Sequence, residues 1–170
     1  MLKMKEIYLA GGCFWGTEHY LKQIRGVITT DVGYANGTGE NPSYEEVYTD
    51  TTGFVECVKV VYDPMVLSLE KIVELYFHSI DPLSLNQQGN DIGTRYRTGI
   101  YYADSGDRAT IESIYRDVES KIGHRLAVEL EPLRNFYNAE EYHQDYLEKN
   151  PTGYCHLPAY LFEYASKANK

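Results

Sequence analysis

The chain has 170 residues, and its 25 acidic against 16 basic side chains give a formal net charge of −9 at pH 7. That charge disfavours nucleic acid and anionic membrane surfaces as partners, and no apolar run approaches the ~18 residues of a spanning helix. The length suits one domain with its own core, so we expect a single domain over residues 1–170.

Periodicity of apolar residues predicts strands and helices in alternation. In chain order, strands are expected at residues 6–10, 27–34, 54–62, 97–102 and 125–131. Helices are expected at residues 13–24, from 42 onward, at 68–80, at 111–122, and from 138 to before 151. The last of these is predicted from a capping box of Asn138 and Glu141. The order β-α-β, β-α-β and then α and β predicts a two-layer α/β domain.

The cysteines are Cys13, Cys57 and Cys155, an odd set without a close pair. A disulfide-stapled secreted domain normally has a denser, even set, and Cys13 lies too near the start to leave room for a secretory signal. We therefore expect a cytoplasmic protein with reduced thiols, one or two of them reactive.

Cys13 lies in the run Gly12-Cys13-Phe14-Trp15-Gly16, between a strand pattern and a helix pattern. The free N–H groups and the positive dipole end of a starting helix favour a thiolate over a thiol. We therefore expect a lowered pKa for Cys13, next to an aromatic wall made by Phe14 and Trp15.

Glu56 shares one face of its predicted strand with Phe54 and Val58, whereas Cys57 lies on the other face. A carboxyl on an apolar face loses solvent, which raises its pKa and lets it donate a proton at neutral pH. The alternative is that Glu56 lies on an exposed edge or forms an ion pair with a lysine or an arginine. Cys57 is expected to be a small buried side chain.

Two irregular segments also carry candidates. The polar loop from Gly89 to Tyr96 joins a helix to a strand, and such loops often line sites, although Asx-turn chemistry also accounts for Asp91. The last twenty residues lack a clear period, and Cys155 there is either an inert thiol or one that reaches Cys13. The histidines show no ligand spacing, and there is neither a metal motif nor a nucleotide motif.

The motifs together resemble one family, the A-type peptide methionine sulfoxide reductases, from about residue 6 to about residue 156. The resemblance is carried by these runs, in chain order: Gly-Cys-Phe-Trp-Gly at 12–16, Asn-Pro-Ser-Tyr at 41–44, Thr-Gly at 52–53 before Glu56, Tyr-Asp-Pro at 62–64, Gln-Gly-Asn-Asp at 88–91, His-Gln at 143–144, and Lys-Asn-Pro with Gly-Tyr-Cys at 149–155. Their number and order make the resemblance specific.

The resemblance implies a role for each candidate. Cys13 corresponds to the nucleophile that attacks the sulfoxide sulfur, and Glu56 to the acid that protonates its oxygen. The other correspondences are Tyr44 and Tyr96 as hydrogen-bond donors to that oxygen, Asp91 as a polar residue near the nucleophile, and Phe14 and Trp15 as the wall around the substrate methyl group. The implied fold is a two-layer sandwich with a ferredoxin-like core, a mixed sheet with helices packed on it, and an irregular C-terminal tail.

The resemblance also implies how the enzyme is recycled. Attack leaves Cys13 as a sulfenic acid, which Cys155 resolves to a disulfide that thioredoxin or another dithiol reduces. No cysteine follows Cys155, which favours direct reduction of that disulfide, and Cys57 remains a possible alternative partner for Cys13. Expected substrates are oxidised proteins and free methionine sulfoxide in the S form, with no bound cofactor, no metal, and a monomeric enzyme.

Two other functions remain open on the residues alone. In a cysteine hydrolase or acyltransferase, Cys13 would attack a carbonyl with His19, His124 or His143 as base. In a binding module, the chain would use the surface of its 17 tyrosines without catalysis.

Overall fold

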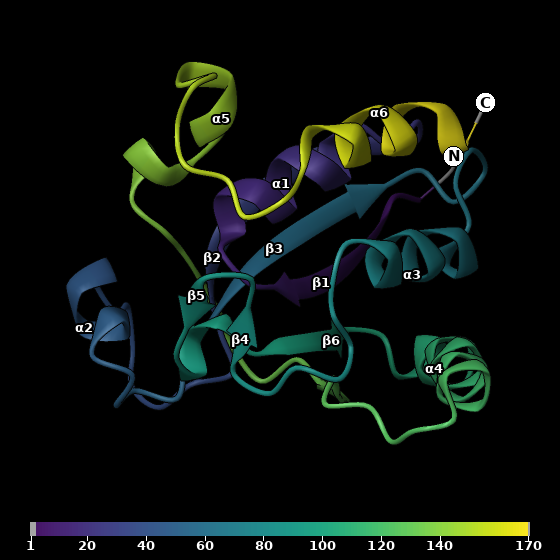
Figure 1. Cartoon of the computed structure of the whole chain (residues 1–170), viewed down its shortest axis with the longest axis horizontal. Coiled ribbons are helices and arrows are strands. Elements are labelled where there is room, and N and C mark those ends of the chain that lie inside the picture. Colours follow the sequence, from purple (N-terminus) through teal and green to yellow (C-terminus); the bar gives the residue numbers. More distant parts are fainter. Residues whose placement is uncertain (1–2, 170) are drawn as a thin grey trace.

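The computed structural model describes residues 3–169. Its main sheet has six strands in the order β7-β6-β1-β3-β2-β8. These strands are β1 (Lys5–Gly11), β2 (Val27–Ala35), β3 (Val55–Tyr62), β6 (Thr98–Tyr102), β7 (Glu129–Pro132) and β8 (Phe136–Asn138), and a separate small ladder pairs β4 (Gln87–Gln88) with β5 (Asp91–Ile92). The helices are α1 (Phe14–Lys22), α2 (Tyr44–Tyr48), α3 (Leu69–His78), α4 (Arg108–Ile122), α5 (Tyr146–Lys149) and α6 (Ala159–Ala168) (Figure 1).

The four central strands have the ferredoxin-like order β6-β1-β3-β2, and every neighbouring pair among them is antiparallel. They come from two successive βαβ units, β1-α1-β2 and β3-α3-β6. β7 extends the sheet parallel to β6, and β8 extends it antiparallel to β2. The predicted mixed α/β fold with a ferredoxin-like core is therefore confirmed.

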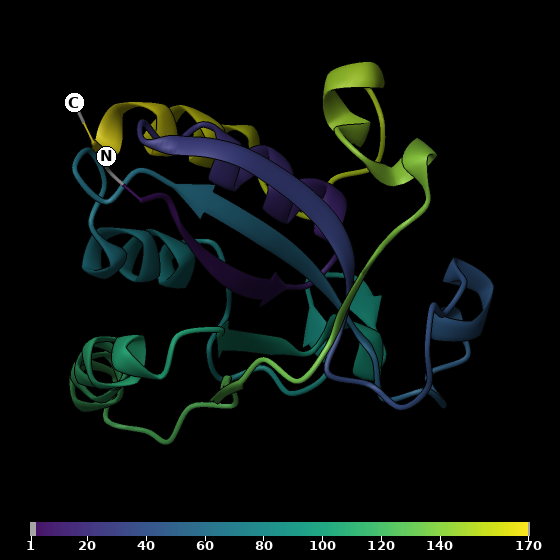
Figure 2. The same cartoon turned by 180° about the vertical axis from the view of Figure 1, so that it is seen from behind.

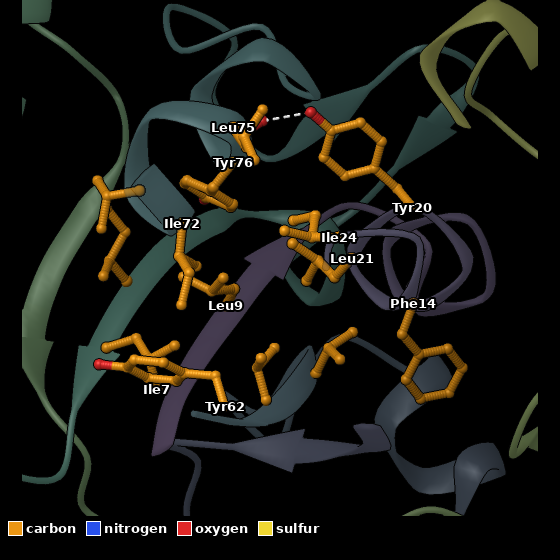
Figure 3. Packing of buried hydrophobic residues seen from close by; sticks show 14 of the residues in the cluster. Ile7, Leu9, Phe14, Tyr20, Leu21, Ile24, Tyr62, Ile72, Leu75 and Tyr76 are labelled. Atoms are coloured by element: carbon orange, nitrogen blue, oxygen red, sulfur yellow. Dashed lines mark hydrogen bonds between the residues drawn. The ribbon is translucent and has the colours of Figure 1, made fainter. Parts of the chain in front are cut away.

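One face of the sheet carries the helices and the main core. Alternate strand residues such as Ile7 and Leu9 of β1 join side chains of α1 and α3 in a single apolar cluster (Figure 3). Cys57 lies in a second, smaller cluster on the other face with Tyr8 and Ala10. The predicted alternation of β3 is thus confirmed, and Cys57 faces away from α1.

The predicted helix from residue 138 is wrong. The chain there forms the end of β8, a 3₁₀ turn at Glu141–His143 and the single turn α5, separated by Asp145 in the left-handed region at φ 52°. The side chain of Gln144 accepts from the N–H of Val32 and donates to its C=O. These bonds to β2 hold the segment beside the sheet, where Figure 2 shows it rising past β2 toward α5.

The C-terminal tail contains more regular structure than expected. Helix α6 follows Pro158, buries Leu161 and Ala165, and lies beside α1 (Figure 1). The short helix α2 begins at Tyr44 rather than at Pro42, because Ser43 and Glu46 form a capping box there. Across residues 3–169, no helix has the length and hydropathy needed to cross a membrane.

The Tyr76 hydroxyl bridges two neighbouring strands below the turn that carries Cys13. It donates to the C=O of Ala10 at 2.6 Å and accepts from the N–H of Gly99 at 3.1 Å, and Ala10 and Gly99 are paired across β1 and β6. The side chain is fully buried, so water is excluded from these groups.

Replacing Tyr76 with Phe should therefore lower the free energy of unfolding by about 1–3 kcal/mol, since two buried backbone groups lose their partner. Urea denaturation monitored by circular dichroism measures this change. Tyr160→Phe is the matched control, because Tyr160 is 69% exposed. Equal stability of the two variants would contradict the bridging role.

Candidate active site

Cys13 stands at the turn between β1 and α1, as the residue that precedes the first helical turn. Gly12 has φ 92°, and a Cβ there would lie 2.8 Å from the side chain of Gln88, so the turn requires glycine. The backbone N–H groups of Trp15 and Gly16, in the first turn of α1, act to lower the pKa of the Cys13 thiol.

A cavity of about 390 Å³ opens beside this turn. Its lining residues come from five separate parts of the chain and are Cys13, Phe14, Trp15, Tyr44, Tyr48, Glu56, Asn90, Asp91, Tyr96 and Tyr154. Seven of the eight residues that the sequence singled out are among them. The eighth, Cys155, follows Tyr154 in the chain but does not line the cavity.

Glu56 reaches the cavity from β3, on the face that carries α1. Its Oε1 accepts from the N–H of Phe14 at 3.1 Å, so one of the free donors of the first turn of α1 is paired with this carboxyl. The side chain is 1% exposed. Burial raises the pKa of Glu56 to about 8, against the lowering effect of the Phe14 bond, so the carboxyl is protonated at neutral pH. The reading of Glu56 as an exposed edge residue is wrong.

The expected lowering of the Cys13 pKa is wrong in net direction. Burial raises the pKa of the thiol well above its ordinary value, the charge of an ionised Glu56 raises it further, and the helix N–H groups offset this only in part. Cys13 is 6% exposed. When Glu56 is protonated the repulsion disappears but the loss of solvent remains. Without a bound ligand, the neutral thiol and the neutral carboxyl therefore stand together.

Tyr44 and Tyr96 form part of the opposite wall. Burial raises the pKa of Tyr44 to about 12 and raises that of Tyr96 further, so both phenols keep their protons as donors. The guanidinium of Arg95 stacks on the rings of Tyr48 and Tyr96 at 4.2 and 4.3 Å from their centroids. Asp50 pairs with Arg95 and so holds the stack.

Trp15 is fixed by His143 and Tyr146, for which the sequence predicted no contact with the indole. Its indole N–H donates to Nδ1 of His143 at 3.0 Å, and Tyr146 stacks on it with ring centroids 3.7 Å apart and planes within 11°. Burial lowers the pKa of His143, which keeps the ring neutral and able to accept. The indole therefore has one defined orientation in the cavity wall.

The buried Glu18 of α1 secures the segment that carries these two rings. Its carboxylate accepts from the N–H of Asp145 and from the hydroxyl of Thr30, both at 2.8 Å, and Lys22 forms an ion pair with Asp145. Burial raises the pKa of Glu18 to about 7. The left-handed Asp145 is thereby tied to the helix that carries Trp15.

Asp91 connects the polar loop to the C-terminal tail. Its Oδ1 accepts from the Tyr154 hydroxyl at 2.8 Å, while Oδ2 is buried and has no hydrogen-bond partner within residues 3–169. Cys155, next to Tyr154, is half-buried and lies against the first turn of α1, where a Cβ on Gly16 would be 3.0 Å from its sulfur. The tail thus reaches the turn that carries Cys13.

Three cavity residues were missed from the sequence. Tyr48 follows Tyr44 by four residues, so helical spacing already places both rings on one face. Asn90 lies within the polar loop that was considered, and Tyr154 lies within the motif that ends in Cys155. None of the bases proposed for a hydrolase, His19, His124 and His143, lines the cavity, and that alternative is not supported. In residues 3–169 no cluster of three potential metal ligands occurs.

The burial of Glu56 predicts a pH-dependent cost to folding. In the unfolded chain a glutamate ionises near its ordinary value of 4.5, but in the fold it does so near 8. The folded state therefore binds more protons between these values, and stability falls as pH rises through that window. Glu56→Gln keeps an oxygen for the Phe14 N–H and removes the ionisation, so the variant should gain stability relative to the parent from pH 5 to pH 8.

Within this window, the gain should grow by up to ~1.4 kcal/mol for each pH unit, which is the free energy of one unit of pKa difference. Urea denaturation of both proteins at pH 5 and pH 8 measures it. Glu45→Gln, on the exposed α2, is the control and should show no such trend. A stability difference between Glu56→Gln and the parent that stays constant with pH would show that Glu56 is ionised in the folded protein.

Comparison with known proteins agrees with this geometry. The sequence matches the family described as peptide methionine sulfoxide reductase over residues 5–170. It is 51% identical to the peptide methionine sulfoxide reductase MsrA of Clostridium perfringens strain 13 over 154 residues, which are 91% of this chain and 98% of that protein. The crystal structure of reduced Mxr1 from Saccharomyces cerevisiae superposes with a TM-score of 0.86 at 41% identity, covering 90% of this chain and 89% of Mxr1.

A second structure of Mxr1, in complex with Trx2, has a TM-score of 0.57 at 29% identity and covers 85% of each chain. The family match over most of the chain and the identity above 50% agree with the motifs seen in the sequence. The chain therefore belongs to the peptide methionine sulfoxide reductases, thiol-dependent enzymes that reduce methionine sulfoxide.

Proposed function

We propose that this enzyme reduces the S form of methionine sulfoxide, free and within oxidised proteins, in the cavity beside Cys13. The observation that carries the proposal is the pairing of Cys13 with a protonated carboxyl. Glu56 is buried beside the first turn of α1, and its pKa of about 8 leaves it a proton to give at neutral pH. A sulfoxide needs both a sulfur nucleophile and an acid for its oxygen, whereas an ester needs a base.

The proposed reaction is balanced without an outside reagent. The Cys13 sulfur attacks the sulfoxide sulfur while Glu56 gives its proton to the sulfoxide oxygen, and the thiol proton of Cys13 restores Glu56. The S–O bond of the substrate breaks, oxygen is transferred to the Cys13 sulfur, which becomes a sulfenic acid, and methionine is released. Burial keeps the Cys13 thiol neutral until the substrate arrives. The sulfoxide oxygen then takes the proton of Glu56, and the carboxylate that this leaves makes deprotonation of the thiol favourable.

The cavity walls support the remaining roles. We assign the substrate methyl group to the apolar surface of Phe14 and Trp15, since a wall of this kind selects by shape. Tyr44 and Tyr96, which keep their protons, donate to the sulfoxide oxygen as charge develops on it. Asp91 acts as an acceptor that orders the polar side of the cavity, an assignment supported by its unpaired Oδ2.

We assign the second thiol to Cys155, which would convert the sulfenic acid of Cys13 to a disulfide. Thioredoxin would reduce that disulfide, as the complex of Mxr1 with Trx2 suggests for a related protein. Cys57 is a poor alternative, because it lies fully buried on the opposite face of β3. We further propose that residues 1–170 form one domain that acts as a cytoplasmic monomer without a bound cofactor and without nucleic-acid or membrane partners.

The parent enzyme with thioredoxin, thioredoxin reductase and NADPH should reduce the separated S sulfoxide and leave the R sulfoxide unchanged, because a wall selective by shape accepts one arrangement at sulfur. Oxidation of NADPH measures turnover, and dithiothreitol replaces thioredoxin in a parallel assay. Cys13→Ser should lose activity in both assays. Turnover by Cys13→Ser, or equal rates with both epimers, would contradict the proposed chemistry.

Cys155→Ser should release one methionine per enzyme and then stop in the thioredoxin assay, since the sulfenic acid of Cys13 has no partner thiol. Rapid-quench measurement of methionine gives the stoichiometry. Cys57→Ser is the matched control and should cycle at the parent rate. Full cycling by Cys155→Ser would assign the second thiol elsewhere.

A further inference from the structure

The residue after Cys155 is held against the turn that carries Cys13. Nε2 of His156 lies 2.9 Å from the carbonyl oxygen of Gly11. The ring also contacts two glycines: a Cβ on Gly12 would lie 3.1 Å from Nε2, and one on Gly16 would lie 2.9 Å from Nδ1. The imidazole therefore occupies space that only glycine at these two positions leaves free.

The contact with Gly11 determines which nitrogen of His156 carries the proton. A carbonyl oxygen only accepts, so Nε2 donates and Nδ1 of the neutral ring is an acceptor. Burial lowers the pKa of His156, which favours that neutral form at pH 7. Nδ1 is shielded from solvent and has no hydrogen-bond partner within residues 3–169. Such an unpaired buried acceptor calls for an explanation.

The thiol of Cys155 borders the same space as this acceptor without bonding to it. A Cβ on Gly16 would lie 3.0 Å from Sγ of Cys155 and 2.9 Å from Nδ1 of His156. The thiol donates to the C=O of Leu157 at 3.5 Å and accepts from the N–H of the same residue at 3.4 Å. Burial raises the pKa of Cys155, so at neutral pH it is a thiol, a weak nucleophile unless a base removes its proton.

We propose that His156 is the general base for disulfide formation, which rests on the function proposed above for Cys13 and Cys155. A change of the Cys155 side-chain rotamer, which breaks its bonds to Leu157, brings the S–H to Nδ1. The proton passes to Nδ1, the Cys155 sulfur bonds to the Cys13 sulfur, and the S–O bond of the Cys13 sulfenic acid breaks. The leaving hydroxide takes the proton from His156 and departs as water. Cys155 is oxidised and the Cys13 sulfur is reduced, so no further oxidant is needed.

Few charged groups act on His156 and Cys155, so the pH dependence of disulfide formation can be assigned to these two residues. The charged side chain that acts on both groups is Asp91 of β5, which raises the pKa of His156 and of Cys155. Gln88 of β4, which contacts the same turn at Gly12, is uncharged. Burial outweighs Asp91 at His156, because its net pKa lies below the ordinary 6.5.

The test replaces His156 with Gln, whose amide can still donate to Gly11 but has no basic nitrogen. A single turnover with methionine sulfoxide, without thioredoxin, is followed by two readouts: methionine released and free thiols lost. We expect methionine release at the parent rate and disulfide formation slowed roughly 100-fold at pH 7, the usual contribution of a general base. Dimedone should trap the accumulated sulfenic acid of Cys13. The deficit should shrink as pH approaches the pKa of the Cys155 thiol.

His124→Gln is the matched control, because His124 is exposed at the end of α4, and it should form the disulfide at the parent rate. If His156→Gln releases methionine normally and forms the disulfide at the parent rate, the role of His156 is refuted, while the proposed function stands. Failure of the parent to release methionine would instead refute the proposed function.

The parent enzyme decides the question if His156→Gln does not fold. Its rate of disulfide formation should rise through the pKa of His156, below 6.5, and then stay level until the pH approaches the raised pKa of the Cys155 thiol. A rate that instead rises tenfold with each pH unit across this range would show direct ionisation of Cys155 and would exclude a base.

Discussion

The site depends on one hydrogen bond, from the N–H of Phe14 to the carboxyl of Glu56 at 3.1 Å. It joins the first turn of α1 to β3, and so it sets Cys13, the proposed nucleophile, beside Glu56, the proposed acid. The bond lies in the core, where neither group has water as an alternative partner. Burial raises the pKa of Glu56 by more than the bond from Phe14 lowers it, and the carboxyl stays neutral as a result. The same burial acts on Cys13, so one physical cause prepares both reactants in their protonated forms.

Around this pair, rigidity comes from aromatic side chains with polar tips. Tyr20, Tyr76 and Tyr115 are buried, and each hydroxyl donates to a backbone carbonyl distant in the fold. The acceptors lie on α3, on β1 and just before β7, respectively. The abundance of tyrosine is therefore mainly structural, as amphipathic packing predicts. In the cavity the same residue type has another use. Tyr96 is held by the stacked Arg95, and Tyr44 packs against the rings of Tyr48 and His143. Raised pKa values keep both phenols protonated.

The apolar pattern predicted a two-layer α/β domain and singled out Cys13 and Glu56. The ferredoxin-like core and the cavity roles of Tyr44 and Tyr96 came only from the family resemblance. Alternation in residues 54–62 separated Glu56 from Cys57 correctly, because the two-residue period of a strand is a local property. The helix from residue 138 failed because Gln144 bonds to Val32 across 112 positions of sequence, and this outweighs a local capping signal. The contacts of His143 and Tyr146 with Trp15 were not predicted for the same reason, since only the tertiary fold brings these rings to the indole.

The error in the Cys13 pKa has a mechanistic consequence. Helix N–H groups stabilise a thiolate, but a thiol that is 6% exposed loses more from the absence of water than it gains from them. A permanently ionised Cys13 would be open to adventitious oxidation. In the proposed reaction, a neutral thiol beside a neutral acid avoids this until a sulfoxide oxygen arrives to take a proton. The helix terminus then contributes at the moment when negative charge forms on sulfur, so it acts on the transition state more than on the resting enzyme.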